Sequence, residues 1–198
     1  MSDERAELEA RIRAACTAGN WSDAATLGLA TYGPELLGYL VAMTRDETAA
    51  SDAFSIFSEH LWKGLPKFRW ECSFRTWAYG LARHALGRWR RDPHRRRATP
   101  LSDTAAEAIA ADVRSQTATF LRTETEDKVA AIRAQLDPDD QTLLILRLNR
   151  QLQWRDIARI LADDEELEDA EASRRAASLR KRFERLKEVL RERVNAAG

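Results

Sequence analysis

The sequence predicts an all-α protein made of two small helical modules joined by a flexible linker. Only 8 Gly and 5 Pro interrupt its 198 residues, and the chain is rich in the helix-favouring residues Ala, Leu, Arg and Glu. It contains no alternating run of Val, Ile or Thr of the kind that forms strands. A chain of this length is sufficient for two modules that each bury a hydrophobic interior.

The first part of the chain predicts a series of helices. A stretch near the N-terminus, DERAELEARIRAAC, is typical of a short helix with Leu8 and Ile12 on one side, and we expect it to have a packing role. Residues 21–97 predict the first module, in which Gly and Pro at residues 33–34 and 64–66 break the helices.

The rest of the chain predicts a linker and a second module. Residues 98–125 are rich in Ser, Thr and Ala and have few large apolar side chains, which is typical of a linker. Residues 126–193 predict the second module, in which Asp137-Pro138-Asp139 signals a helix start. Two later helices are expected at RDIARIL and ASLRKRFERLKEVL.

The residue types that carry chemistry are sparse, so the sequence predicts no enzyme, no catalytic residue, no metal site and no cofactor. Cys16 and Cys72 are the only cysteines, the three histidines are dispersed, and no nucleophile stands near a base. The chain opens with no signal peptide, and no apolar run approaches the roughly 20 residues of a membrane span. We therefore expect a protein of the reducing cytoplasm, with no membrane span.

Charge is strongly segregated, although the formal net charge is zero. Residues 61–97 carry 11 basic and 2 acidic groups, and residues 173–193 carry 9 and 3. The rest of the chain is acidic. Two separate basic blocks suggest two contacts with one long polyanion, the alternative being two solvated helix faces.

The helix expected to start near Phe74 has two different faces. At 100° per residue, a stripe predicted to be buried contains Phe74, Ala78, Leu81 and Ala85. The opposite face, predicted to meet an anion, contains Thr76, Tyr79, Arg83 and Arg90.

Aromatic and cationic side chains alternate just before this helix, at Phe68, Arg69, Trp70 and Phe74. An aromatic ring beside a cation is what an unstacked base requires, and such stacking contributes about 1–3 kcal/mol per base. The alternative is that these rings are ordinary core. The preceding helix has one apolar face, but Ile56 is predicted to lie outside it, exposed among Asp52, Glu59 and Lys63. An apolar residue surrounded by charges favours docking against another helix, and the alternative is ordinary protein surface.

Three stretches resemble the RNA polymerase sigma factors of the extracytoplasmic-function group, which keep only sigma regions two and four. They are LWKGLPKF, SFRTWAYGLARHALGRWRR and LDPDDQTLLILRLNRQLQWRDIARIL. The resemblance covers roughly residues 30–97 and 126–190. It implies that residues 50–65 bind the polymerase core, and the helical-wheel pattern makes Asp52, Ile56, Glu59 and Lys63 the candidate contacts.

The resemblance also assigns DNA contacts. The loop before Phe74 would capture a flipped base of the minus-ten element, and the next helix would contact the upstream duplex. The residues assigned to minus-ten DNA are Phe68, Arg69, Trp70, Ser73, Tyr79, Arg83 and Arg90. The last helix resembles the recognition helix of a helix-turn-helix, which reads base edges with its N-terminal residues. Its minus-thirty-five candidates are Arg174, Ala177, Ser178 and Lys181.

Residues 162–172, ADDEELEDAEA, depart from the family pattern, because a helix-turn-helix normally has a turn of about 3–4 residues there. Seven of these eleven residues are acidic. Two interpretations stay open. The enlarged acidic turn is either an electrostatic lid over Arg174, Arg175 and Lys181, or a set of carboxylates that cap the following helix.

The sequence therefore favours a promoter-specificity factor whose partners are RNA polymerase core and promoter DNA. Two alternatives remain: a helix-turn-helix regulator that acts without polymerase, and a purely structural helical adaptor. The resemblance leaves open whether an anti-sigma protein holds the factor inactive.

Overall fold

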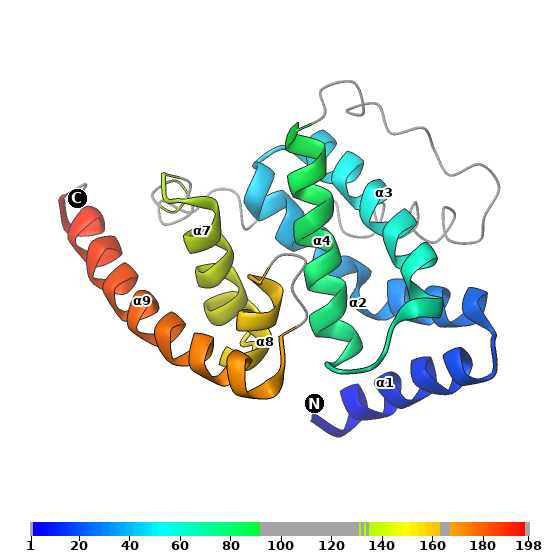
Figure 1. Cartoon of the computed structure of the whole chain (residues 1–198). Helices are drawn as coiled ribbons and strands as arrows, with labels where there is room; N and C mark the ends of the chain where they lie inside the picture. The colour runs from blue at the N-terminus through cyan, green and yellow to red at the C-terminus, as the bar shows by residue number, and fades with distance from the viewer. Residues whose placement is uncertain (1, 92–130, 132, 134, 163–166, 197–198) are drawn as a thin grey trace. The chain divides into compact units, whose positions relative to one another are not determined.

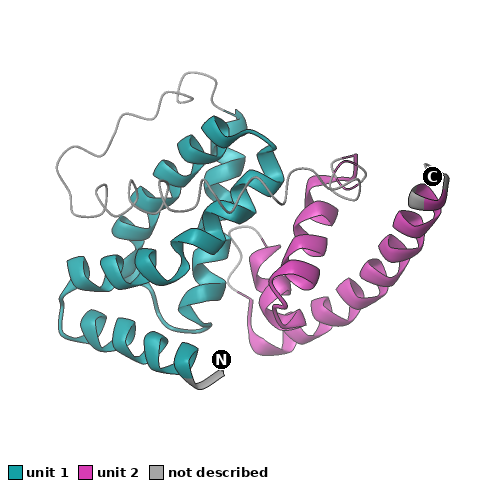
Figure 2. Cartoon of the chain, turned by 180° about the vertical axis from the view of Figure 1, so that it is seen from behind, with its two compact units in different colours: residues 1–120 teal, residues 121–198 magenta. Residues whose placement is uncertain are grey.

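The computed structural model describes residues 2–91, 131, 133, 135–162 and 167–196. The chain divides into two compact units, residues 1–120 and 121–198, which are coloured separately in Figure 2. In the part of the chain that the structure describes, every regular element is a helix. This confirms the predicted all-α class. The linker predicted at residues 98–125 lies outside the described residues.

The first unit is built from four described α-helices and one short 3-10 helix, shown in Figure 1. They are α1 (Ser2–Thr17), α2 (Trp21–Thr44), α3 (Glu47–Gly64), η1 (Leu65–Lys67) and α4 (Phe74–Arg91). Helices α2, α3 and α4 pack against one another, and α1 packs on α2. The helix predicted near the N-terminus is thus present, and its Ile12 is fully buried.

Aromatic side chains from three helices fill the core of this unit. Phe54 and Phe57 of α3 are fully buried with their ring centroids 5.4 Å apart. Tyr39 of α2 and Tyr79 of α4 are also fully buried and meet edge to face at 5.6 Å. Burial of a large apolar side chain stabilises a fold by about 1.5–3 kcal/mol, so these rings fix how the three helices pack.

The break predicted at Gly33-Pro34 is wrong, because α2 continues through Pro34. Proline in a helix interior removes one hydrogen bond and costs about 3 kcal/mol or more. Neighbouring side chains of α2, among them Leu36 and Leu40, are buried, and this packing outweighs that cost. The second predicted break is confirmed, since α3 ends at Gly64 and η1 follows it.

The second unit contains α7 (Pro138–Leu144), a π-helical turn η3 (Ile145–Asn149), α8 (Trp154–Ile160) and α9 (Asp169–Ala196). The predicted helix start is confirmed, because the Asp137 side chain accepts the N–H of Asp139 at 2.9 Å and Pro138 is the first helical residue. Helix α8 packs on α9. None of the described helices combines the length and hydropathy that a bilayer span requires.

Candidate nucleic-acid interface

The loop between η1 and α4 carries an ordered aromatic cluster. Phe68 stacks on Trp77 of α4, with ring centroids 4.5 Å apart and planes 14° apart, and it also contacts Trp70 at 4.7 Å. Phe74 meets Phe68 and Trp77 edge to face at 6.4 and 5.6 Å. Phe74 is fully buried, whereas Phe68, Trp70 and Trp77 are half-buried. The aromatic cluster, Phe68, Trp70, Phe74 and Trp77, is therefore anchored in the core and open at its edge.

Two glycines make room for this cluster. A Cβ atom at Gly28 of α2 would clash with the Phe74 ring, and one at Gly64 would lie 2.9 Å from the Trp77 ring. Only glycine permits such a close approach of the helix backbone to an aromatic ring.

Trp70 has a φ of 61°, in the left-handed region that bulky residues rarely adopt. Such strain is found at functional sites, where surrounding contacts hold it.

The N-terminus of α4 is capped from two places. The Ser73 hydroxyl accepts the N–H of Thr76 at 3.0 Å, as an N-cap residue does. The Glu9 carboxylate of α1 accepts the N–H groups of Phe74 and Arg75 at 2.7 and 3.0 Å. Ser73, predicted to contact DNA, thus has a structural bond to the backbone of α4.

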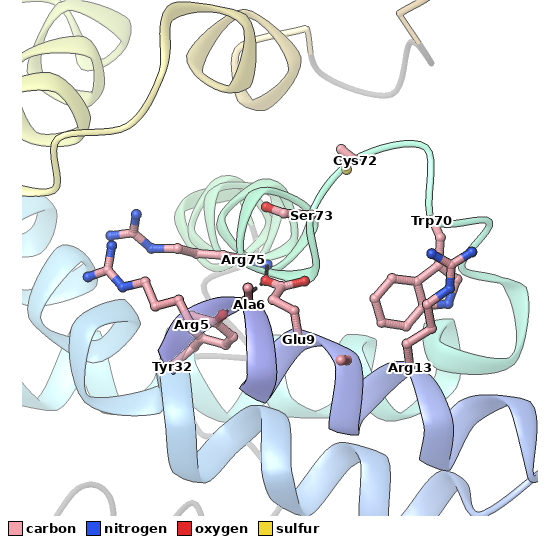
Figure 3. A pocket seen from close by; sticks show the side chains of 10 residues that line it. Arg5, Ala6, Glu9, Arg13, Tyr32, Trp70, Cys72, Ser73 and Arg75 are labelled. Carbon is pink, nitrogen blue, oxygen red and sulfur yellow. Dashed lines mark hydrogen bonds between the residues drawn. The ribbon is translucent and has the colours of Figure 1, made fainter. Parts of the chain in front are cut away.

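A pocket of about 540 Å³ lies between α1, α2 and this loop (Figure 3). Its wall includes Arg5 and Arg13 of α1, Tyr32 of α2, and Trp70 and Cys72 of the loop. The Arg13 guanidinium carbon lies 5.4 Å from the Trp70 ring centroid. Sequence reasoning assigned none of the α1 residues to this site, because the contacts join positions more than fifty residues apart.

Arg75 is held inside the first unit. It donates from Nε and Nη2 to the two carboxylate oxygens of Glu35, at 2.7 and 2.9 Å. Burial alone would lower the pKa of Arg75, but the hydrogen bonds and charge of Glu35 raise it above its usual value. This two-bond ion pair ties α4 to α2 beside the aromatic cluster.

The outward face predicted for α4 is partly wrong. Tyr79 and Thr76, expected to face an anion, are 0% and 2% exposed. Helix α4 packs on both α2 and α3, so its buried arc is wider than a single stripe, and Tyr79 packs on Tyr39. Tyr79 therefore has no surface to offer to DNA.

Arginines do line the accessible part of α4. Arg83 is half-buried and Arg90 is exposed. Arg90 donates to the carbonyl oxygen of Met43 at 3.0 Å, so one of its donors caps the end of α2. Arg69 is exposed in the loop, and its Nε lies 3.3 Å from Oε1 of Glu71. A side-chain ion pair as exposed as this one contributes little to stability.

The exposure predicted for Ile56 on α3 is wrong. Ile56 is only 8% exposed, because the first unit buries more of α3 than the apolar face found by periodicity. Lys63 is 67% exposed and pairs with Glu59, which lowers the pKa of the Glu59 carboxyl. Asp52 is half-buried, and burial raises its pKa. The charged members of the predicted docking face are accessible, and the apolar member is not.

In the second unit, the predicted base-reading residues share the accessible side of α9. All four are exposed: Arg174, Ala177, Ser178 and Lys181. The opposite side packs, with Phe183 and Leu186 buried and Phe183 edge to face with Trp154 of α8 at 5.4 Å. The division of this helix into a packed face and a basic face is as predicted.

The acidic stretch at residues 162–172 is only partly a turn. Residues 163–166 lie outside the described residues, but α9 begins at Asp169. Asp169 pairs with Arg159 of α8. Glu171 accepts hydrogen bonds from both Arg174 and Arg175, each at 3.0 Å. The bond from Arg175 has the larger effect, and both bonds lower the pKa of Glu171. The end of the stretch thus forms the first turn of α9.

Comparisons with known proteins agree on one family. A family model described as Sigma-70 region 2 matches residues 29–97. The RNA polymerase sigma factor YlaC of Bacillus subtilis is 33% identical over 132 residues, which are 66% of this chain and 75% of that protein. The RNA polymerase sigma-H factor of Pseudomonas aeruginosa is 29% identical over 143 residues, 66% of this chain and 70% of that protein. No solved structure matches the chain.

The matched residues contain the aromatic cluster and the arginines of α4, so the family match and the candidate interface coincide in the first unit. The chain belongs to the RNA polymerase sigma factors, of the extracytoplasmic-function type.

Proposed function

We propose that the chain binds RNA polymerase core, recognises promoter DNA through both units and helps to melt it at the start of transcription. The first unit binds the minus-ten element of the promoter, and the second unit binds the minus-thirty-five element. The observation that carries this proposal is the aromatic cluster, anchored by the buried Phe74 and open at its edge, which lies with the arginines of α4 within the residues matched by the region-two model.

The chemistry of the first unit suits strand opening without any catalytic group. An unpaired base that leaves the duplex loses its stacking, and a base placed on Trp70 regains about 1–3 kcal/mol. Arg69, Arg83 and Arg90 supply positive charge for the phosphates near that base. On this proposal the chain is not an enzyme itself, and it acts in the cytoplasm with the polymerase.

In the second unit, Arg174 and Lys181 lie about two helical turns apart on the exposed face of α9, with Ala177 and Ser178 between them. Small side chains let a helix approach the base edges in the major groove, and flanking cations contact phosphate or guanine. The exposed face of α9 therefore suits a recognition helix.

The direct test is reconstitution of the chain with RNA polymerase core. We expect the two to co-purify, and we expect the complex to start transcription at defined sites that sequencing of the transcript starts identifies. The alternative is a helix-turn-helix regulator that acts without being a polymerase subunit. DNA binding by the second unit with no transcription from core polymerase would favour that alternative.

The docking surface can be tested with its charges. The Glu59→Lys and Lys63→Glu exchanges together keep the ion pair but exchange its two charges. We expect the double variant to retain its melting temperature and to recover less core polymerase than the parent. Recovery equal to that of the parent would remove this face from the proposal. Ile56 is unsuitable for the test, because a charge at this buried position would destabilise the unit and confound the result.

A further inference from the structure

Glu9 of α1 is the residue that joins the N-terminal helix to the aromatic cluster. Helix α1 ends at Thr17, before the residues that the region-two model matches. Glu9 is half-buried, one turn before the fully buried Ile12, and its carboxylate points to the start of α4 (Figure 3). The contact links positions 65 residues apart in the sequence.

Three donors converge on this carboxylate. Oε2 accepts the N–H of Phe74 at 2.7 Å, and Oε1 accepts the N–H of Arg75 at 3.0 Å. The Tyr32 hydroxyl donates to Oε1 at 2.9 Å. Burial, and then the charge of Glu9, raise the pKa of Tyr32, so this hydroxyl keeps its proton and remains a donor.

These bonds complete the cap of α4. The first N–H groups of a helix have no partner within the helix, and a negative charge beside them is favourable. Ser73 satisfies only Thr76 among the first three helical residues of α4, and Glu9 supplies the acceptors for Phe74 and Arg75. The start of α4 is therefore fixed by a residue of another helix.

The geometry also shows how Glu9 acts. Both carboxylate oxygens already accept hydrogen bonds from the protein, so their task is to hold backbone groups. One of those groups belongs to Phe74, whose ring packs on Phe68 and Trp77. A change in the position of the Phe74 backbone would move the aromatic cluster, of which Trp70 lines the pocket.

We propose that Glu9 is a positioning residue for strand opening: it fixes the start of α4 and so holds the aromatic cluster ready for an unpaired base. The proposal rests on the promoter-melting function proposed above. It assigns α1 a role in opening and not in the first binding of duplex DNA, because Arg83 and Arg90, which we propose to contact phosphate, lie two or more helical turns beyond the capped end of α4.

The experiment compares Glu9→Gln and Glu9→Ala in the full chain. Gln retains one acceptor, and Ala removes both. Loss of a charge-assisted hydrogen bond predicts about tenfold faster amide hydrogen exchange at Phe74 and Arg75 in Glu9→Ala, with Glu9→Gln intermediate. With core polymerase, we expect permanganate-detected opening to slow in the same order, while the affinity of the closed complex stays that of the parent.

Two controls separate positioning from stability. Glu7→Gln removes a carboxylate from the exposed side of α1 and should behave as the parent. Ile12→Val loosens the packing of α1 without removing an acceptor of the cap. It should leave the rate of promoter opening unchanged even where its melting temperature is as low as that of Glu9→Gln. If Ile12→Val slows opening as much as Glu9→Gln, Glu9 is merely structural and the inference is wrong.

The failure of this inference can be told from failure of the proposed function. If the parent opens a promoter and Glu9→Gln opens it equally fast, only the positioning role is excluded. If the parent itself opens none, the melting function is excluded, and the positioning role for opening falls with it. Unchanged amide exchange at Phe74 and Arg75 in both Glu9 variants would overturn the capping step directly, without polymerase.

Discussion

The Arg13 guanidinium carbon lies 5.4 Å from the centroid of the Trp70 ring, so helix α1 covers one side of the residue that we propose to stack on a promoter base. Phe68 contacts the same ring at 4.7 Å. Trp70, which holds a left-handed φ of 61°, is thus kept in place by a cation and an aromatic neighbour.

The Arg13–Trp70 contact is expected to contribute measurably to stability. A cation above an aromatic ring at an exposed site contributes about 0.5–1 kcal/mol. A double-mutant cycle of Arg13→Ala and Trp70→Ala, measured by urea denaturation, should give a coupling free energy in that range. Arg11→Ala in place of Arg13→Ala is the control, and a coupling equal to the control value would show that the contact contributes nothing.

The arginines of α4 are expected to act through phosphate. Replacing Arg83 by Gln should weaken promoter binding by the holoenzyme and reduce the slope of log affinity against log salt by about 0.9 for each phosphate that the variant no longer neutralises. Arg90→Gln should do the same and also lower the melting temperature, because Arg90 donates to Met43. A salt slope equal to that of Arg11→Gln would argue against phosphate binding at these positions.

His60 should make the first unit sensitive to mild acid. Burial, and then the charge of Arg88, whose Nη1 lies 3.2 Å from the His60 Nε2, lower the pKa of His60 below 6.5. The charges of His84 and Lys63 lower this pKa further, and the charge of Glu59 opposes the shift without reversing it. The unfolded chain then binds this proton more readily than the folded chain, so the stability is present above pH 6.5 and is lost as pH falls through the folded value.

The His60→Gln variant keeps an acceptor for Arg88 but does not titrate. Between about pH 7 and about pH 5, its free energy of unfolding should fall less than that of the parent. Parallel pH profiles for the two proteins would contradict the role of His60.

Glu171 is expected to stabilise α9 more than it shields the basic face. Glu171→Gln should lower the melting temperature, because the carboxylate lies in the first turn and binds Arg174 and Arg175. The affinity of the full chain for minus-thirty-five DNA at low salt should rise no more than for Glu188→Gln, which removes an exposed carboxylate from the same helix. A clearly larger rise would favour the electrostatic lid.

Local signals in the sequence predicted much of this fold. Asp137 caps α7 because its side chain reaches a backbone N–H two residues away, which is a short-range rule. The packed face of α9 was also predictable, since its apolar side chains recur at the helical period and the structure packs α8 and α7 on this helix. Both features depend on residues that are close in sequence or on one regular period.

The errors arose where several helices meet. Periodicity gives the direction of a side chain, but not how many neighbours surround the helix, so Tyr79 and Ile56 were expected on the surface and are buried. Glu9 could not be found at all, because its partners Phe74 and Arg75 are brought to it only by the packing of the unit. Long-range contacts of this kind leave no pattern in the sequence.

The central claim is that Trp70 receives an unpaired base when the promoter opens. The most direct measurement is permanganate reactivity of the minus-ten thymines, with core polymerase and either the parent or the Trp70→Ala variant. Because base stacking contributes about 1–3 kcal/mol, opening by the variant should be reduced by about tenfold or more while closed-complex affinity is unchanged. Equal opening by the two proteins would contradict the claim.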